Sequence, residues 1–195
     1  MSSHEGIIML IIKRIFMLLT MLTGWNLIVL PKIDYKVSLV QINSIDSVIQ
    51  RNGKIVYVDM VGDLFHFGHT EMLRRAHDFG DYVILGLHGD DDCTQYKRTP
   101  ILTLAERIGA GLACRYVDAV LPYAPLITSD ELFDSLNIAV VLHGDDFNQE
   151  KTEKLYGAAI RRGIFKILPY TKGISTSEII QRVLQYNNMS TQPNP

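Results

Sequence analysis

This 195-residue sequence contains few cysteines and has almost no net charge. Its two cysteines, Cys93 and Cys114, have the spacing of neither a metal site nor a redox pair. This argues against a disulfide-held scaffold and favours two reduced thiols in a cytosolic protein. Lysine and arginine number 19 against 21 acidic residues, which gives a formal charge of −2. Nucleic acid is therefore not an expected partner, because its binding needs a strong basic patch.

Low-complexity stretches and internal repeats are also missing from the sequence. Hydrophobic residues make up 47% of the chain and charged residues 21%, a balance typical of a folded domain rather than of a disordered protein. A chain of this length supplies the core of one domain and leaves room for an appendage.

The appendage is a strongly apolar stretch within residues 1–30. Lys13 and Arg14 interrupt it and leave residues 15–30 without a charge, slightly short of the roughly 20 residues of a spanning helix. Three interpretations stay open: a membrane-associated anchor through residues 7–30, a disordered extension or translation-start artefact, and a cleaved targeting segment. We expect a cytoplasmic protein, which the first interpretation would attach to the cytosolic face of a membrane.

The rest of the chain divides into a connector, a regular domain and a tail. Residues 31–53 have a mixed pattern, in which KVSLVQI forms either a strand or part of a short helix. In residues 54–187, five short apolar runs alternate with helical patterns, and residues 188–195 are a polar tail. This order predicts the α/β class, with a Rossmann-like, doubly wound parallel sheet of five strands and helices on both faces.

Sheets of this kind bind ligands beyond the carboxyl ends of their strands. The residues that stand out chemically collect in the loops that follow the predicted strands. These loops are residues 61–69, 88–100, 143–148 and 170–176. The sequence therefore predicts a functional site at this edge of the sheet.

Two histidines in the first of these loops are the most prominent candidates. His66 follows the first strand, His69 begins the next helix, and Gly68 between them allows a close backbone approach. Two imidazoles beside a helix N-terminus suit the oxygens of a phosphate group. A shared zinc ion and a packing or capping role are the alternatives, but a third zinc ligand at a supportive spacing is missing.

Five blocks in order give the sequence a family resemblance. They are GDLFHFGH, YKRTPILTLAER, CRYVDAVLPYAP, VLHGDDF and YTKGISTSEII. Together they resemble the cytidylyltransferases that make CDP-ethanolamine, CDP-choline and CDP-glycerol, within the wider H-x-G-H nucleotidyltransferase superfamily. The resemblance covers residues 56–184. It implies a homodimer that uses CTP, with Mg²⁺ carried on the triphosphate, and acts on a small phosphomonoester in phospholipid head-group synthesis.

The resemblance also implies roles for individual residues. His66, His69 and Lys97 form the expected catalytic group, with the histidines stabilising charge on the α-phosphate and the lysine contacting phosphate. The expected nucleotide-binding residues are Val61, Gly62, Asp63, Gly68, His143, Gly144, Asp145, Asp146, Thr171, Lys172, Gly173, Ile174, Ser175 and Thr176. Asp63 is expected to shape its loop rather than act as a base. No residue is expected to bind a metal directly.

Several positions depart from the family pattern. Tyr170 stands where an arginine usually contacts the triphosphate, and Lys172 is a candidate replacement for its charge. Gly62 stands where an aromatic residue is common. Leu126 replaces an aromatic residue that in the choline-type enzymes can meet an ammonium group.

Phosphoethanolamine is the favoured substrate, because the LHGDD and APLITSDEL segments are most similar to that branch. One alternative is a nucleotidyltransferase that uses ATP, or that acts on phosphocholine, glycerol phosphate or a sugar phosphate. The other is a catalytically weak, membrane-attached nucleotide-binding protein, for which Tyr170 is the motivating feature.

Overall fold

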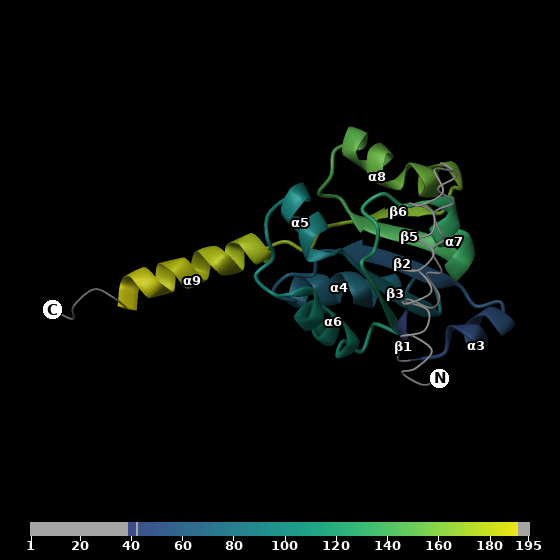
Figure 1. Cartoon of the computed structure of the whole chain (residues 1–195), viewed down its shortest axis with the longest axis horizontal. Coiled ribbons are helices and arrows are strands. Elements are labelled where there is room, and N and C mark those ends of the chain that lie inside the picture. The colour runs from purple at the N-terminus through teal and green to yellow at the C-terminus, as the bar shows by residue number, and fades with distance from the viewer. Residues whose placement is uncertain (1–38, 42, 191–195) are drawn as a thin grey trace, which may run out of the picture. The chain divides into compact units, whose positions relative to one another are not determined.

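The computed structural model describes residues 39–41 and 43–190 (Figure 1). The apolar N-terminal segment lies outside these residues, and its three interpretations therefore stay predictions. Within the part of the chain that is described, no helix combines the length and the apolar character needed to cross a membrane. Cys93 and Cys114 are both free thiols, as expected.

One sheet of six strands forms the centre of the domain, in the order β1-β4-β3-β2-β5-β6. Its strands are β1 (Val40–Gln41), β2 (Ile55–Met60), β3 (Tyr82–Leu87), β4 (Ala119–Pro122), β5 (Ile138–Gly144) and β6 (Phe165–Leu168). β2 to β6 pair in parallel, while β1 runs antiparallel to β4. The predicted parallel sheet is confirmed, but the predicted number of strands was one too low.

The additional strand, β1, lies in the stretch that was interpreted as a connector. It has two residues, too few for an alternating pattern to reveal it in the sequence. Within the described part of KVSLVQI, Val40 and Gln41 form a strand, as one of the two options predicts. The following helix, α3 (Ile45–Gln50), buries Ile45 and Val48 in the core. Part of the expected connector therefore belongs to the fold.

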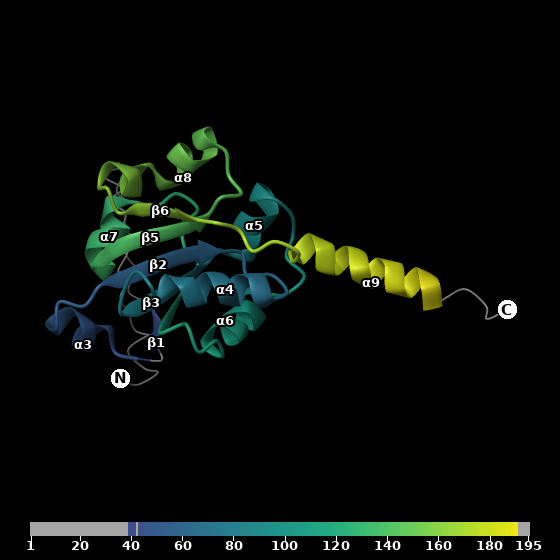
Figure 2. The ribbon, with the colours of Figure 1, turned by 180° about the vertical axis from the view of Figure 1, so that it is seen from behind.

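Helices cover both faces of the sheet, as predicted (Figures 1 and 2). The remaining helices are α4 (Phe67–Ala76), α5 (Asp90–Tyr96), α6 (Leu104–Leu112), α7 (Asp130–Leu136), α8 (Gln149–Arg161) and α9 (Thr176–Ser190). α3, α7 and α8 contribute to the hydrophobic core on one face, and α4 and α6 to the core on the other.

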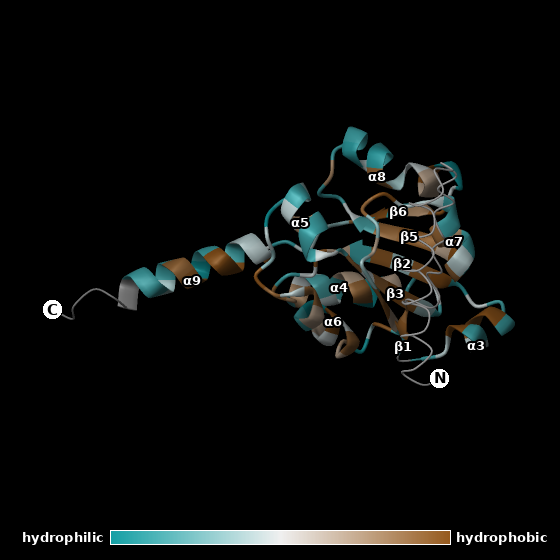
Figure 3. Ribbon diagram, in the orientation of Figure 1, coloured by the Kyte–Doolittle hydropathy of each residue, from teal (hydrophilic) through white to brown (hydrophobic). Residues whose placement is uncertain are grey.

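The two cores explain why the strands are continuous apolar runs. Ile55 and Tyr57 of β2 face the first core, and Val56 and Val58 face the second, and none of the four is exposed. Figure 3 shows the same hydrophobic strands between helices in which hydrophilic and hydrophobic residues are mixed. A parallel strand buried on both faces has no position for an alternating polar residue.

Two helices differ in how strongly their local sequence indicates them. At the start of α6, Thr103 and Glu106 form a capping box, in which Thr103 N donates to the Glu106 carboxylate at 2.8 Å. α5 was missed because its sequence, DDDCTQY, buries only Cys93 and so has no apolar periodicity. Its three aspartates lie in the first turn, where negative charge stabilises a helix.

Candidate functional site

A pocket opens at the carboxyl ends of the strands, where the strand order reverses between β2 and β5. All four predicted loops contribute to it. The predicted residues that line it are Val61, Gly62, Asp63, His66, Gly68, His69, Lys97, His143, Gly144, Asp146, Thr171, Ser175 and Thr176. Four predicted residues do not line it: Asp145, Lys172, Gly173 and Ile174. The fold thus brings most of the predicted site residues together.

The two histidines form a reciprocal cap on the start of α4. His66 Nδ1 accepts a hydrogen bond from Gly68 N at 3.1 Å, and His69 Nδ1 accepts one from His66 N at 3.2 Å. The two rings stack with centroids 3.8 Å apart. A Cβ on Gly68 would lie 3.0 Å from the His66 ring, so a glycine lets the ring fold back onto the backbone. The capping alternative is therefore real.

Capping leaves Nε2 of each histidine ring available, because the cap hydrogen bonds involve only Nδ1. Burial lowers the pKa of both side chains, and with the neighbouring His66 it lowers the pKa of His69 to about 3. Both rings are therefore neutral at pH 7. A neutral ring whose Nδ1 accepts a hydrogen bond carries its proton on Nε2. Each histidine consequently directs one N–H donor into the pocket, and that of His66 also lies 3.5 Å from Thr176 Oγ1.

Asp63 shapes the loop that carries the histidines, which fits the role expected for it. Its carboxylate accepts hydrogen bonds from Ile101 N and Leu102 N at 2.9 to 3.1 Å and pairs with Arg98 Nη1 at 3.1 Å. Gly62 beside it has a φ of +70°, a left-handed conformation that disfavours a side chain. The backbone conformation of this chain thus favours a glycine at position 62.

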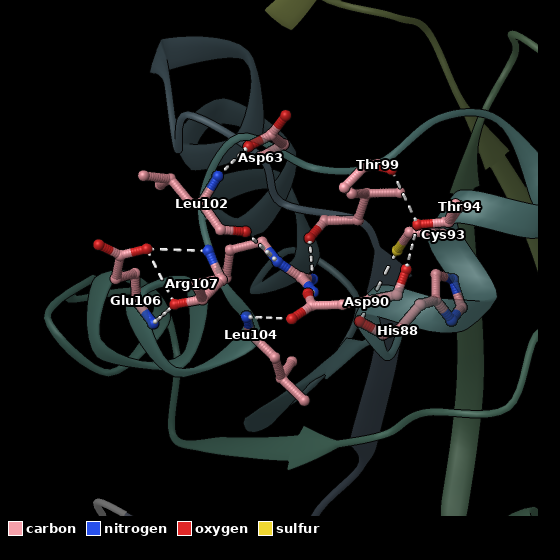
Figure 4. Close-up of polar contacts among 12 residues, drawn as sticks. Asp63, His88, Asp90, Cys93, Thr94, Thr99, Leu102, Leu104, Glu106 and Arg107 are labelled. Carbon is pink, nitrogen blue, oxygen red and sulfur yellow. Dashed lines mark hydrogen bonds and ion pairs between the residues drawn. The ribbon is translucent and has the colours of Figure 1, made fainter.

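Arg107 is a structural residue of the site that the sequence did not reveal (Figure 4). Its side chain is fully buried in α6 and donates to Val61 O at 2.6 Å, to Leu102 O at 3.2 Å and to Asp90 Oδ1 at 2.5 Å. One guanidinium thus connects the histidine loop, the loop after Lys97 and the first turn of α5. In the sequence it looks like any arginine on a solvated helix.

A buried polar network at the floor of the pocket was also missed. Tyr156 Oη of α8 donates to Asp59 Oδ1 at 2.7 Å and lies 2.8 Å from His143 Nδ1. His143 Nε2 lies 3.4 Å from Asp146 Oδ1. Asp59 Oδ2 is buried and has no hydrogen-bond partner among the described residues. The one sequence signal was an aspartate at the end of an otherwise apolar strand.

His143 holds a positive charge in this network. Burial alone would lower its pKa, but Asp146 and Asp59 outweigh burial and raise the pKa to about 9. For Asp59, burial would raise the pKa, and His143 together with His88 reverses this and lowers it. With the proton on both ring nitrogens, His143 Nδ1 donates to Tyr156, which in turn donates to Asp59.

The raised pKa of His143 predicts a pH-dependent stability. Its protonated form stabilises the folded state fully below the unfolded pKa of about 6.5, and this stabilisation is lost as the pH rises through about 9. Relative to His143→Gln, the wild-type free energy of unfolding should fall by about 2 kcal/mol between pH 6 and pH 10. Urea unfolding of both proteins across this range measures the difference. Parallel pH curves would contradict the assignment.

The pocket carries little unpaired positive charge for a triphosphate. Arg98 pairs with Asp63, and His143 lies between two carboxylates, which leaves the exposed Lys97 as its unpaired cation among the described residues. Tyr170 lines the pocket where the arginine was expected, and its backbone N donates to Asp145 Oδ1 at 2.8 Å. Asp145 therefore holds the loop rather than facing the pocket.

The last loop links the two ends of the domain sequence. Thr176 Oγ1, at the start of α9, donates to Asp63 O at 3.0 Å and lies 3.5 Å from His66 Nε2. Ser175 Oγ accepts from Glu178 N at 3.1 Å and so caps this helix. Both hydroxyls line the pocket next to the histidine loop.

The described residues contain no group of three or more His, Cys, Asp or Glu side chains arranged to hold a metal ion.

A doubly wound sheet with polar side chains at its switch point is an architecture that many nucleotide-binding α/β domains share. Comparison with known proteins identifies the family. The model of the cytidylyltransferase-like family matches residues 62–182. The chain therefore belongs to this family, which confirms the resemblance.

Two relatives show how similar this chain is to known proteins. The chain is 41% identical over 138 residues to an ethanolamine-phosphate cytidylyltransferase from Dictyostelium discoideum, covering 68% of this chain and 38% of that protein. It is 39% identical over 140 residues to the Arabidopsis thaliana protein of the same name, covering 68% and 33%. The chain thus spans about a third of the length of these relatives.

The fold has a counterpart in the crystal structure of a lipopolysaccharide core biosynthesis protein from Thermoplasma volcanium GSS1. The TM-score is 0.51 at 20% sequence identity, over 63% of this chain and 99% of that one. At this identity the likeness concerns the fold alone.

Proposed function

We propose that this domain transfers CMP from CTP to phosphoethanolamine, giving CDP-ethanolamine and pyrophosphate in phospholipid head-group synthesis. The observation that carries the proposal is the stacked histidine pair, which keeps two Nε2–H donors at the start of α4. The names of the two relatives support the choice of nucleotide and substrate.

The reaction needs positioning and charge stabilisation rather than a covalent intermediate. A phosphate oxygen of phosphoethanolamine attacks the α-phosphorus of CTP and forms the new P–O bond. The bond from the α-phosphorus to the bridging oxygen breaks, and that oxygen leaves with pyrophosphate. His66 and His69 donate to the oxygens on which negative charge increases. Lys97 contacts the phosphates, and Mg²⁺ enters as part of the MgCTP substrate.

The floor of the pocket suits the amino end of the substrate. Asp59 is 2% exposed, and its Oδ2 has no hydrogen-bond partner among the described residues. Leaving a buried carboxylate oxygen unpaired is unfavourable, and an ammonium N–H is its natural partner. Asp146, also in the pocket, adds a second carboxylate.

A direct assay tests the proposal. The full chain is incubated with CTP or ATP and a panel of phosphomonoesters, with and without Mg²⁺, and pyrophosphate release is measured. We expect release with MgCTP and phosphoethanolamine. Release only with ATP, phosphocholine, glycerol phosphate or a sugar phosphate would replace the substrate. Nucleotide binding without release under any condition would favour a catalytically weak binding protein.

Two assembly proposals follow, the first from the family resemblance and the second from the apolar N-terminal sequence. The chain forms a homodimer, which light scattering of the purified protein measures directly; a monomeric mass would refute it. Residues 7–30 attach the protein to a membrane, which fractionation of cells expressing the full chain or a form without these residues would test. Equal partition of the two forms would remove the membrane proposal.

A further inference from the structure

Two aromatic rings in the pocket are already in contact with a cation from the protein itself. Tyr96 ends α5, and Phe147 lies just before α8; both line the pocket, with ring centroids 6.4 Å apart. Lys151, in the first turn of α8, places its Nζ 4.3 Å from the Tyr96 centroid and 4.0 Å from the Phe147 centroid. These distances are those of a cation–π contact with both rings.

The position of Lys151 in its helix makes this contact informative. A positive charge in the first turn is disfavoured by the helix dipole. Lys154, one turn further along the same helix, is exposed. The lysine of the first turn is instead partly buried against the two rings, which offset the unfavourable position.

We propose that Lys151 determines which kind of ammonium group the pocket accepts, a proposal that rests on the function proposed above. Because Lys151 already occupies the aromatic pair, a substrate ammonium is left with the carboxylates of Asp59 and Asp146. A primary ammonium has N–H groups that can donate to these oxygens. A quaternary ammonium has none and depends on aromatic faces. Lys151 therefore favours phosphoethanolamine over phosphocholine.

Two further features of the pocket agree with this selection. Leu126 lines the pocket with an aliphatic side chain and offers no aromatic face to a quaternary ammonium. Asp59 Oδ2 is the buried acceptor that still lacks a partner among the described residues. The site thus has a carboxylate oxygen that lacks a partner in the described part of the chain, and its Tyr96–Phe147 pair is already in contact with a cation.

Removing the lysine charge tests the proposal. The variants Lys151→Gln and Lys151→Met should raise the ratio of kcat/KM for phosphocholine to that for phosphoethanolamine by about fivefold, the size of one cation–π contact. Lys151→Arg keeps a cation over the rings and should keep the wild-type ratio. Lys154→Gln removes an exposed lysine from the same helix and is the matched control, with no change expected.

A double variant shows whether the rings cause the effect. In Tyr96→Leu/Lys151→Gln, the increase in the ratio of kcat/KM for phosphocholine to that for phosphoethanolamine should disappear, because one of the two uncovered rings is gone. A folded Lys151→Gln or Lys151→Met protein with the wild-type ratio would overturn the proposal while leaving the proposed function intact. A wild-type protein that turns over neither substrate would overturn the proposed function, and this proposal with it.

Discussion

The His69→Ala variant should turn over substrate about 100-fold more slowly than the wild type, or slower still, while its affinity for CTP changes much less. The expected loss is the size found when one preorganised donor to a transition state is removed. The structure gives the physical reason. Nδ1 of His69 caps His66 N, and a pKa of about 3 keeps the ring neutral with Nε2–H as a donor. Steady-state pyrophosphate release and calorimetric CTP binding measure the two quantities.

The control for this variant lies on the same helix. His77, at the C-terminal end of α4, is outside the pocket, so His77→Ala should retain wild-type turnover. His69→Ala also removes part of the helix cap and could therefore destabilise the fold. Thermal melting followed by circular dichroism shows whether both variants remain folded, so that a loss of turnover can be assigned to the missing donor. Unchanged turnover in His69→Ala would show that the histidine assignment is wrong.

Arg107→Met should lower the free energy of unfolding by about 3 kcal/mol. The methionine fills part of the space but leaves the carbonyl oxygens of Val61 and Leu102 without their buried donor. Denaturant unfolding measures the effect. Arg182→Met, at an exposed position of α9, removes an arginine without these bonds and should stay within about 0.5 kcal/mol of the wild type. An equal decrease in the free energy of unfolding in the two variants would contradict the role of Arg107 in connecting these segments.

Arg107→Met should also reduce activity under conditions in which it remains folded. The guanidinium fixes the histidine loop through Val61 O and the loop after Lys97 through Leu102 O. Loss of both bonds loosens two catalytic loops at once. A fully folded variant with wild-type kcat would show that Arg107 acts on stability alone.

The strands and the position of the site could be predicted because both depend on local sequence. Strands buried on two faces must be apolar along their length, and parallel order places the loops after them at one edge. The two histidines were recognisable because imidazoles are unusual in such a loop. Their reciprocal capping was not predictable, because it depends on which nitrogen of each ring accepts a hydrogen bond from the backbone.

Residues that act through distant contacts were not predictable in this way. Tyr156 and Asp59 are 97 positions apart in the sequence and meet only after α8 packs on the sheet. Arg107 has the same local pattern as a solvated helix arginine, and its burial depends on two carbonyls and one carboxylate that three other segments place around it. Lys151 gave no sequence signal, since a lysine in a polar helix is ordinarily solvated.

The strand and helix that precede Lys54 have a practical consequence for anyone shortening the protein. β1 occupies the outer edge of β4, Asn43 Nδ2 donates to Asp118 Oδ1 at 2.7 Å, and Tyr82 Oη donates to Asn43 O. A recombinant form that starts at Lys54 would uncover this edge and the core beneath Ile45 and Val48. Unpaired strand edges template association between molecules, so such a form should self-associate, whereas one that starts at Asp34 keeps the edge protected.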